Sequence, residues 1–149
     1  MTETQNIEYK QSWHDDYLKW ICGFANARGG RVYIGKDDDG RVTGLDDSKS
    51  LMETLPNKIR DLLGIVCEIN LETEDNRHYI EISVQPYSVP VSLRGRYYFR
   101  SGSSKMELTG NALNEFLLKK AGKTWDAVVE EGAALSDIDE TSLRRFLNN

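Results

Sequence analysis

The sequence contains little cysteine and no long hydrophobic run. Its two cysteines, Cys22 and Cys67, are too few for a disulfide scaffold and are not spaced as a metal-binding pair. We therefore expect both thiols to be reduced and buried in the core, as in a cytoplasmic protein. No apolar run approaches the roughly 18 residues of a membrane span, and the N-terminus lacks the apolar core of a signal peptide.

Positive charge is also scarce. The 24 Asp and Glu residues outnumber the 19 Lys and Arg residues, which gives a net charge of -5. This balance argues against a generally basic nucleic-acid binder, so any contact with nucleic acid must come from a local patch. The sequence has no helix-turn-helix or zinc-finger pattern that would read bases. It also lacks the Gly-Lys-Ser/Thr that follows a phosphate-binding loop, so ATP binding is not expected here.

What the sequence does have is a clear central stretch, residues 24–45. An amphipathic helix ends before Gly29-Gly30, which permits a sharp change of direction. A short apolar strand follows, and the acidic turn Asp37–Gly40 then predicts a hairpin with a partner strand over residues 41–44. The helix before it is expected over residues 12–28, with Trp13 and Trp20 on its buried stripe. Alternatively, these two tryptophans are stacking platforms for bases.

The remaining pattern predicts an α/β (α+β) fold, in which a mixed, mostly antiparallel sheet packs against helices. A second helix is expected over residues 48–63, although Pro56 would break or kink it, and a third begins at Thr109. We place a domain over residues 1–121, and a helical C-terminal extension or linker to a missing domain over residues 122–149. Strands are expected near residues 6–10, 30–35, 41–44, 66–72, 78–84, 91–93 and 97–100.

These motifs resemble a known family. The segment FANARGG, a strand that ends in Ile34-Gly35, the acidic turn and Gly44-Leu45 are similar to the Schlafen-type divergent Alba-like domain. The resemblance extends over roughly residues 3–120, since the arginine that ends the strand at Arg100 and the Gly-Ser-Ser loop after it also match. Bacteria carry such domains at the N-terminus of transcriptional regulators and helicase-like proteins. The resemblance therefore implies a DNA-binding module followed by a further domain.

The resemblance also implies a metal site. In the ribonuclease branch of the family, two glutamates and an aspartate of the acidic turn form a metal-dependent nuclease site, and the matching residues here are Glu3, Glu8 and Asp38. Clustered carboxylates bind Mg²⁺ or Mn²⁺ and activate water. Alternatively, Glu8 belongs to the polar face of an edge strand and the acidic turn is merely solvated. Lys36 departs from the family, which has an apolar residue there, and would neutralise the carboxylates or contact a phosphate.

One basic segment stands out in the acidic chain. Residues 94–105 contain no carboxylate, and their Gly and Ser residues offer backbone N–H groups and hydroxyls to phosphate oxygens. The alternative is a solvated hairpin with a helix-capping loop. If the segment binds nucleic acid, the contacts are expected from Arg28, Arg31, Lys36, Arg94, Arg96, Arg100, Ser103, Ser104 and Lys105.

Three functions are consistent with these features. The first is a nucleic-acid-binding module, DNA rather than RNA, at the front of a bacterial transcriptional regulator. The second is a metal-dependent endonuclease that uses the three carboxylates with Mg²⁺ or Mn²⁺. The third is a protein-interaction or dimerisation domain, which the acidity and the apolar C-terminal helix favour; here the partner is a second copy or the missing C-terminal domain.

Overall fold

The structure is a computed structural model that describes residues 6–130, with side chains described through residue 122. Its centre is a four-stranded sheet with the strand order β1-β2-β4-β3. Strands β1 and β2 run parallel, and the other two pairs are antiparallel. The expected mixed, mostly antiparallel sheet is therefore confirmed. The strands are β1 (Ile7–Lys10), β2 (Gly30–Ile34), β3 (Glu68–Glu74) and β4 (Arg77–Val84).

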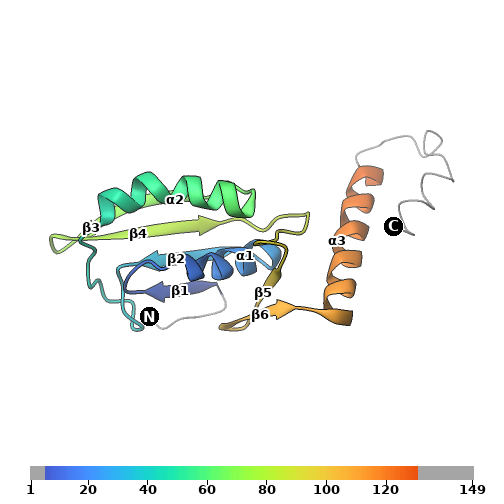
Figure 1. The fold of residues 1–149 in the computed structure, drawn as a ribbon, viewed down its shortest axis with the longest axis horizontal. Coiled ribbons are helices and arrows are strands. Elements are labelled where there is room, and N and C mark those ends of the chain that lie inside the picture. The colour runs from blue at the N-terminus through green and yellow to red at the C-terminus, as the bar shows by residue number, and fades with distance from the viewer. Residues whose placement is uncertain (1–5, 131–149) are drawn as a thin grey trace.

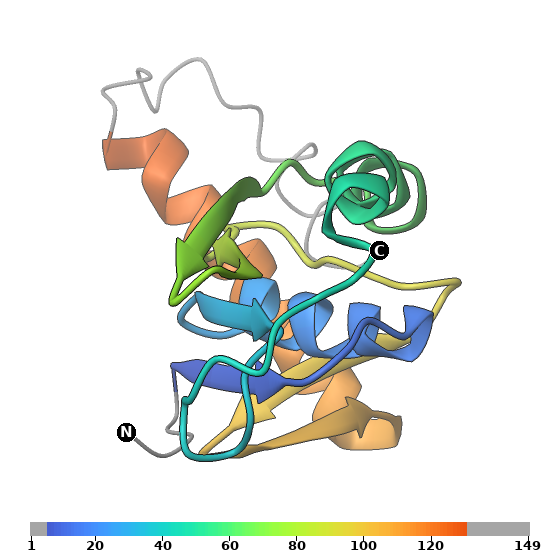
Figure 2. The same ribbon diagram turned by 90° about the vertical axis from the view of Figure 1, so that its left-hand side faces the viewer.

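Two helices, α1 (Leu18–Asn26) and α2 (Ser48–Leu63), cover one face of this sheet (Figures 1 and 2). Residues at alternate strand positions point toward them because side chains along a strand alternate between faces. The core therefore forms from one apolar face of the sheet and one apolar stripe of each helix. Its fully buried members include Ile21, Phe24, Val32, Ile34, Leu55, Ile59, Ile80 and Ile82.

A β-hairpin, β5 (Tyr97–Ser101) and β6 (Ser104–Leu108), packs on the other side of α1. The approach is close: a Cβ added to Gly23 of α1 would lie 3.3 Å from the backbone nitrogen of Arg100. Helix α1 is thus enclosed between the sheet and the hairpin. Helix α3 (Gly110–Glu130) follows β6 and stands at the end of the molecule away from the β3–β4 turn (Figure 1).

Asn26, the last residue of α1, joins the helix to the chain that leads into the hairpin. Its side-chain nitrogen donates to the carbonyl oxygens of Val91 and Tyr98, both at 2.8 Å, and its side-chain oxygen accepts the Val91 N–H at 2.7 Å. The residue is 1% exposed. One amide side chain therefore satisfies three backbone groups, two of Val91 and one of Tyr98 in β5.

The Gly29-Gly30 break is required by packing. A Cβ on Gly29, where φ is +76°, would lie 2.6 Å from the Val84 carbonyl oxygen. A Cβ on Gly30 would lie 2.5 Å from the Phe24 ring. Any larger residue would push β2 away from β4 or from α1. The turn into β2 and its close packing therefore account for the two glycines, and no bound ligand is needed to explain them.

Several predicted boundaries were wrong. The helix predicted from residue 12 begins at Leu18, after the 3₁₀ turn η1 (Asp15–Tyr17), because the side chains of Trp13 and Asp15 bond to each other at 2.8 Å. The strands predicted over residues 41–44 and 91–93 form only isolated bridges. In contrast, α2 matches the prediction, with Pro56 inside it. Helix α3 continues through residue 121, and the domain boundary predicted there stays a prediction. Most of the helical extension predicted over residues 122–149 lies outside the described residues.

No helix in the described part of the chain is long and apolar enough to cross a membrane. The two thiols are both free, and Cys22 is fully buried. Burial raises the pKa of Cys67 from its ordinary value of 9.0 to about 11. The same cause, with a contribution from Glu81, raises the pKa of Tyr33 to about 12. Both groups are therefore kept neutral by the fold.

We expect the free energy of unfolding to fall as the pH rises from about 9 toward 11. The folded state holds the Cys67 proton over this range and the unfolded state releases it, so alkali favours unfolding. Urea titrations at pH 8 and pH 10.5, compared between the wild type and Cys67→Ala, measure the effect. Cys67→Ala should lose less stability than the wild type between these pH values, and an equal loss would contradict the assignment.

Candidate nucleic-acid interface

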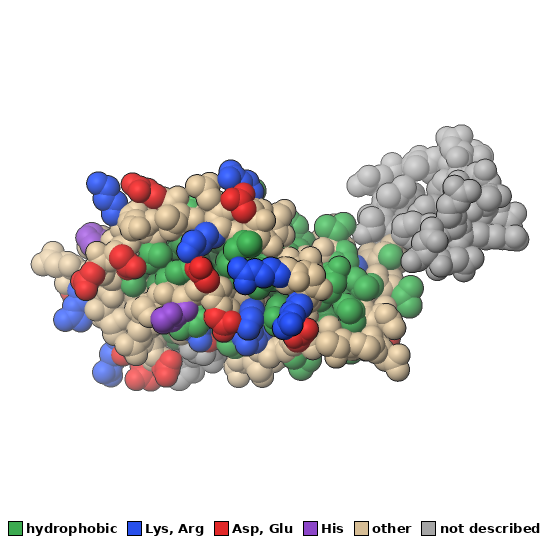
Figure 3. Space-filling view, viewed as in Figure 1, with side chains coloured by type: hydrophobic (Ala, Val, Ile, Leu, Met, Phe, Trp, Pro, Cys, Tyr) green, Lys and Arg blue, Asp and Glu red, His purple; other side chains and the backbone are tan. Residues whose placement is uncertain are grey.

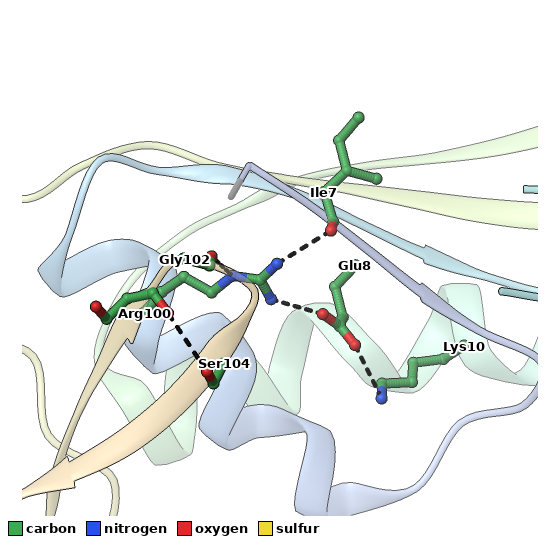
Figure 4. A network of polar contacts seen from close by, with 7 residues as sticks. Ile7, Glu8, Lys10, Arg100, Gly102 and Ser104 are labelled. Atoms are coloured by element: carbon green, nitrogen blue, oxygen red, sulfur yellow. Dashed lines mark hydrogen bonds and ion pairs between the residues drawn. The ribbon is translucent and has the colours of Figure 1, made fainter. Parts of the chain in front are cut away.

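The centre of the site is a buried ion pair between β1 and β5 (Figure 4). An Arg100 Nη1 donates to Glu8 Oε1 at 2.6 Å, and both side chains are almost fully buried. The other guanidinium nitrogens donate to the carbonyl oxygens of Ile7 and Gly102, both at 3.1 Å. Lys10 contacts the second oxygen of Glu8, Oε2, at 3.0 Å. Both carboxylate oxygens of Glu8 are thus held by cations.

Arg100 is also packed between aromatic rings. Its guanidinium carbon lies 4.9 Å from the Trp20 ring and 4.7 Å from that of Phe24. This arrangement fixes the hairpin to α1 and β1 through cation–π contacts and charge-assisted hydrogen bonds. Arg100 was predicted to contact phosphate, but its side chain is 2% exposed. Because Glu8 and the backbone already bind the guanidinium, we exclude it from the exposed surface described next.

Exposed or half-buried cations surround this pair on the face that carries α1 and the hairpin (Figure 3). Lys10 and Lys105 lie 5.0 and 5.4 Å from the Trp20 ring, and Lys19 lies 5.9 Å from the Tyr98 ring. Electrostatic coupling links Arg96 to Lys19 and Arg94 to Asp15, so these arginines border the same face. We name this set the α1 basic surface; its members are Lys10, Lys19, Arg94, Arg96 and Lys105.

Carboxylates lie within this surface as well. Asp16 pairs with Lys19 at 2.6 Å, Asp15 pairs with Lys58 at 2.8 Å, and Glu107 lies 3.8 Å from Arg96. The hydrogen bond from Lys58 lowers the pKa of Asp15, and that from Lys19 lowers the pKa of Asp16. These are solvent-exposed pairs, which a phosphate can replace at small cost. Arg94 and Lys105 form no ion pair with the described residues, although Arg94 lies within electrostatic reach of Asp15 and Lys105 within that of Asp16.

Lys36 lies on the opposite face of the sheet from Glu8. Its ammonium nitrogen is 4.2 Å from the Tyr33 ring centre, 4.4 Å from that of Tyr79 and 6.0 Å from that of Tyr9. Glu8 is at the next strand position from Tyr9 and therefore faces α1 instead. The family has an apolar residue at this position, and the cation–π contacts with the three tyrosine rings explain why a lysine is accommodated here. Although its backbone N–H donates to the Lys10 carbonyl oxygen at 3.1 Å, the Lys36 side chain lies on the other face of the sheet and does not belong to the α1 basic surface.

The other predicted phosphate contacts are divided between two places. Arg28 and Arg31 are exposed at the far end of α1, beyond Asn26. Ser103 and Ser104 are exposed at the turn of the hairpin, where Ser104 donates to the Ser101 carbonyl oxygen at 3.5 Å. The predicted residues therefore do not form one continuous patch.

Among the predicted metal ligands, Glu3 lies outside the described residues. Glu8 does not fit a metal ligand in this arrangement, because Arg100 and Lys10 already hold its two oxygens. Asp38 is exposed in the acidic turn, which its neighbour Asp37 closes by accepting the N–H groups of Asp39 and Arg41. No group of three or more potential ligands is present among the described residues. The metal and nuclease hypotheses stay predictions.

Sequence reasoning missed Lys10, Lys19 and Lys58 as surface cations. Lys10 belongs to β1 and Lys19 to α1, so neither lies near residues 94–105 in the sequence. The only sequence evidence for Lys19 was its position between the two helical aromatics Tyr17 and Trp20. The Arg100–Glu8 pair, 92 residues apart, left no local pattern.

Comparison with solved structures supports the same fold. One similar structure is the DIP2311 protein of Corynebacterium diphtheriae, with a TM-score of 0.59 and 18% identity; the match covers 70% of this chain and 22% of that one. Another is the N-terminal domain of a RecG-related protein of Nitrosomonas europaea, with a TM-score of 0.51, 23% identity, and 70% and 84% coverage. The chain thus spans about a fifth of the first relative's length.

No curated protein matches the sequence at a significant level. The family model described as Schlafen, AlbA_2 matches residues 3–109, which include α1, α2 and the six strands of the described residues. The match takes in the Gly-Gly break, the acidic turn and the basic hairpin on which the resemblance was argued. This chain belongs to the Schlafen AlbA_2 family.

Proposed function

We propose that the chain is a nucleic-acid-binding module that holds phosphates on the α1 basic surface, in a bacterial, cytoplasmic transcriptional regulator that binds DNA. The family and the helicase-related description of the Nitrosomonas europaea protein support a nucleic-acid-related domain. The observation that carries the proposal is the gathering of cations around Trp20 and Tyr98 in a chain of net charge -5.

Geometry favours backbone contacts over base reading. The hairpin and α1 are locked together by Arg100 and Asn26, so the cations project from a rigid support. A rigid array of Lys and Arg side chains gives salt-dependent binding without sequence preference. Specificity, if the full protein has it, would then come from another domain.

The test is the salt dependence of binding to a labelled duplex. We expect the triple variant Arg94→Gln/Arg96→Gln/Lys105→Gln to weaken binding and to lower the slope of log K against log salt by roughly 2–3, since each phosphate contact contributes about 0.9. Fluorescence anisotropy at several salt concentrations measures both quantities.

A matched control removes the same charge elsewhere. Arg41, Lys49 and Arg60 are exposed and lie outside the α1 basic surface, so Arg41→Gln/Lys49→Gln/Arg60→Gln should keep the wild-type slope. Equal losses in the two triple variants would mean that only net charge matters, and the proposal would be wrong. Single-stranded DNA and structured RNA, run beside the duplex, decide the type of nucleic acid.

The same samples test the two other predicted functions. Cleavage of the probe only with Mn²⁺ or Mg²⁺, and its loss in Asp38→Ala, would support the nuclease hypothesis. A sedimentation mass of two chains that falls to one when residues 122–149 are removed would support the dimerisation hypothesis.

A further inference from the structure

Two cavities meet at Arg28, at the opposite end of α1 from Asp15. The first, about 340 Å³, lies where β2 begins and β4 ends, and its polar lining includes Arg28, Arg31, Ser83 and Gln85. The second, about 270 Å³, lies between the hairpin and α3 and is lined by Arg28, Phe99, Phe116 and Lys119. Arg28 therefore lines both cavities, one of them polar and the other aromatic.

Two of the cations at this junction, Arg28 and Lys119, are uncompensated by any described residue. Neither cavity has a carboxylate among the described residues that line it. The side chains of Arg28 and Lys119 are exposed and make no hydrogen bond or ion pair with any described residue. Arg31 contacts the hydroxyl of Tyr33, which Glu81 of β4 also contacts, so its charge is shared with that carboxylate outside the cavity. In a chain with an excess of carboxylates, such a cluster indicates an anionic ligand.

The aromatic cavity supplies a second type of contact. The rings of Phe99 and Phe116 are 6.0 Å apart at an interplanar angle of 71°, and both side chains are half-buried, which leaves ring surface exposed. Lys120 fixes this wall by donating to the Tyr87 carbonyl oxygen at 2.6 Å. A planar base packs well against such rings, and the phosphate of the same nucleotide would then reach Arg28.

We propose that the junction binds one nucleotide with a terminal phosphate, its base against Phe99 and Phe116 and its phosphate between Arg28 and Arg31. A terminal phosphate carries about -1.5 to -2 charges, against -1 for a phosphate within a strand. Two arginines in a cavity that no carboxylate lines therefore favour the strand end. The α1 basic surface and the junction lie toward opposite ends of α1. A strand whose terminal nucleotide occupies the junction would therefore run along α1 and place its other phosphates on the α1 basic surface. This inference rests on the proposed function.

The experiment compares one oligonucleotide with a 5′-phosphate, with a 3′-phosphate and with hydroxyl groups at both ends. We expect one phosphorylated form to bind about tenfold more tightly than the hydroxyl form, since a charge-assisted contact is added. Arg28→Gln should abolish this difference, and Lys119→Gln should reduce it. Arg41→Gln, which removes an exposed arginine from the acidic turn, should leave it unchanged.

Competition by AMP separates two sources of the ligand. If AMP displaces the phosphorylated oligonucleotide, the junction accepts free nucleotides; if it does not, the site takes strand ends. Equal affinity for all three oligonucleotides would overturn the proposal while leaving the α1 basic surface intact. If no oligonucleotide binds at all, the proposed function fails, and a direct AMP titration then decides the junction: binding lost in Arg28→Gln supports it, and no binding overturns it.

Discussion

Replacing Arg100 with methionine is expected to lower the free energy of unfolding by about 3 kcal/mol, as is found when one partner of a buried ion pair is removed. Glu8 would remain 2% exposed with only Lys10 beside it. The hairpin would also lose its two hydrogen bonds to the Ile7 and Gly102 carbonyl oxygens. Guanidinium titrations followed by tryptophan fluorescence measure the loss.

Two further variants test the cause. Arg96→Met removes an exposed arginine whose nearest carboxylate, in Glu107, is 3.8 Å away, so it should cost less than about 1 kcal/mol. The double variant Glu8→Leu/Arg100→Met replaces the buried pair by apolar groups and should recover most of the stability lost in Arg100→Met. The contrary result would be a double variant whose loss in the free energy of unfolding equals the sum of the losses in Glu8→Leu and Arg100→Met. The buried ion pair would then not be the source of the destabilisation.

Asn26→Ala is expected to cost a similar amount, about 3 kcal/mol. The change leaves two carbonyl oxygens and the Val91 N–H without their side-chain partner, and each buried unsatisfied group costs about 1–3 kcal/mol. The Val91 carbonyl oxygen keeps the thiol of Cys22 at 3.3 Å, which limits the loss. Asn57→Ala, at an exposed position of α2, is the control and should stay within about 0.5 kcal/mol of the wild type.

Asn26→Asp adds a pH dependence of known sign. The new carboxylate would face the carbonyl oxygens of Val91 and Tyr98 in a buried site, so its pKa in the folded state would rise. The folded state would then bind a proton more tightly than the unfolded chain, and stability would be lost as the pH rises through the raised pKa. Equal stability of Asn26→Asp at acidic and neutral pH would contradict the hydrogen-bond assignment.

The fold could be predicted to a large extent because its main elements have local signals. The apolar stripe and the glycine at residue 64 fix α2, and alternation fixes β3 and β4. Strand β6 was missed because Ser104–Leu108 is polar and its outer side chains are exposed. The two-residue turn between β5 and β6, with Gly102 at φ +60°, was the signal that could have revealed it.

The site was predicted less well, for a physical reason. Spacing along the chain finds residues such as Arg94, Arg96 and Lys105 that share one hairpin. It cannot show that Arg100, in the same segment, turns inward to a carboxylate on β1, or that Lys19 of α1 joins the surface. A basic segment in the sequence therefore contained both a structural cation and surface cations, and only their neighbours in the fold distinguish them.

The contacts that hold the hairpin also determine when the basic surface can exist. Arg100 must find Glu8 across 92 residues, and Asn26 must find Tyr98 across 72. Pairings this distant form late, since a long loop has to close before they contribute any stability. During synthesis, β1 and α1 leave the ribosome well before their partners in the hairpin. The nascent chain would therefore acquire its basic surface only once β5 and β6 have emerged.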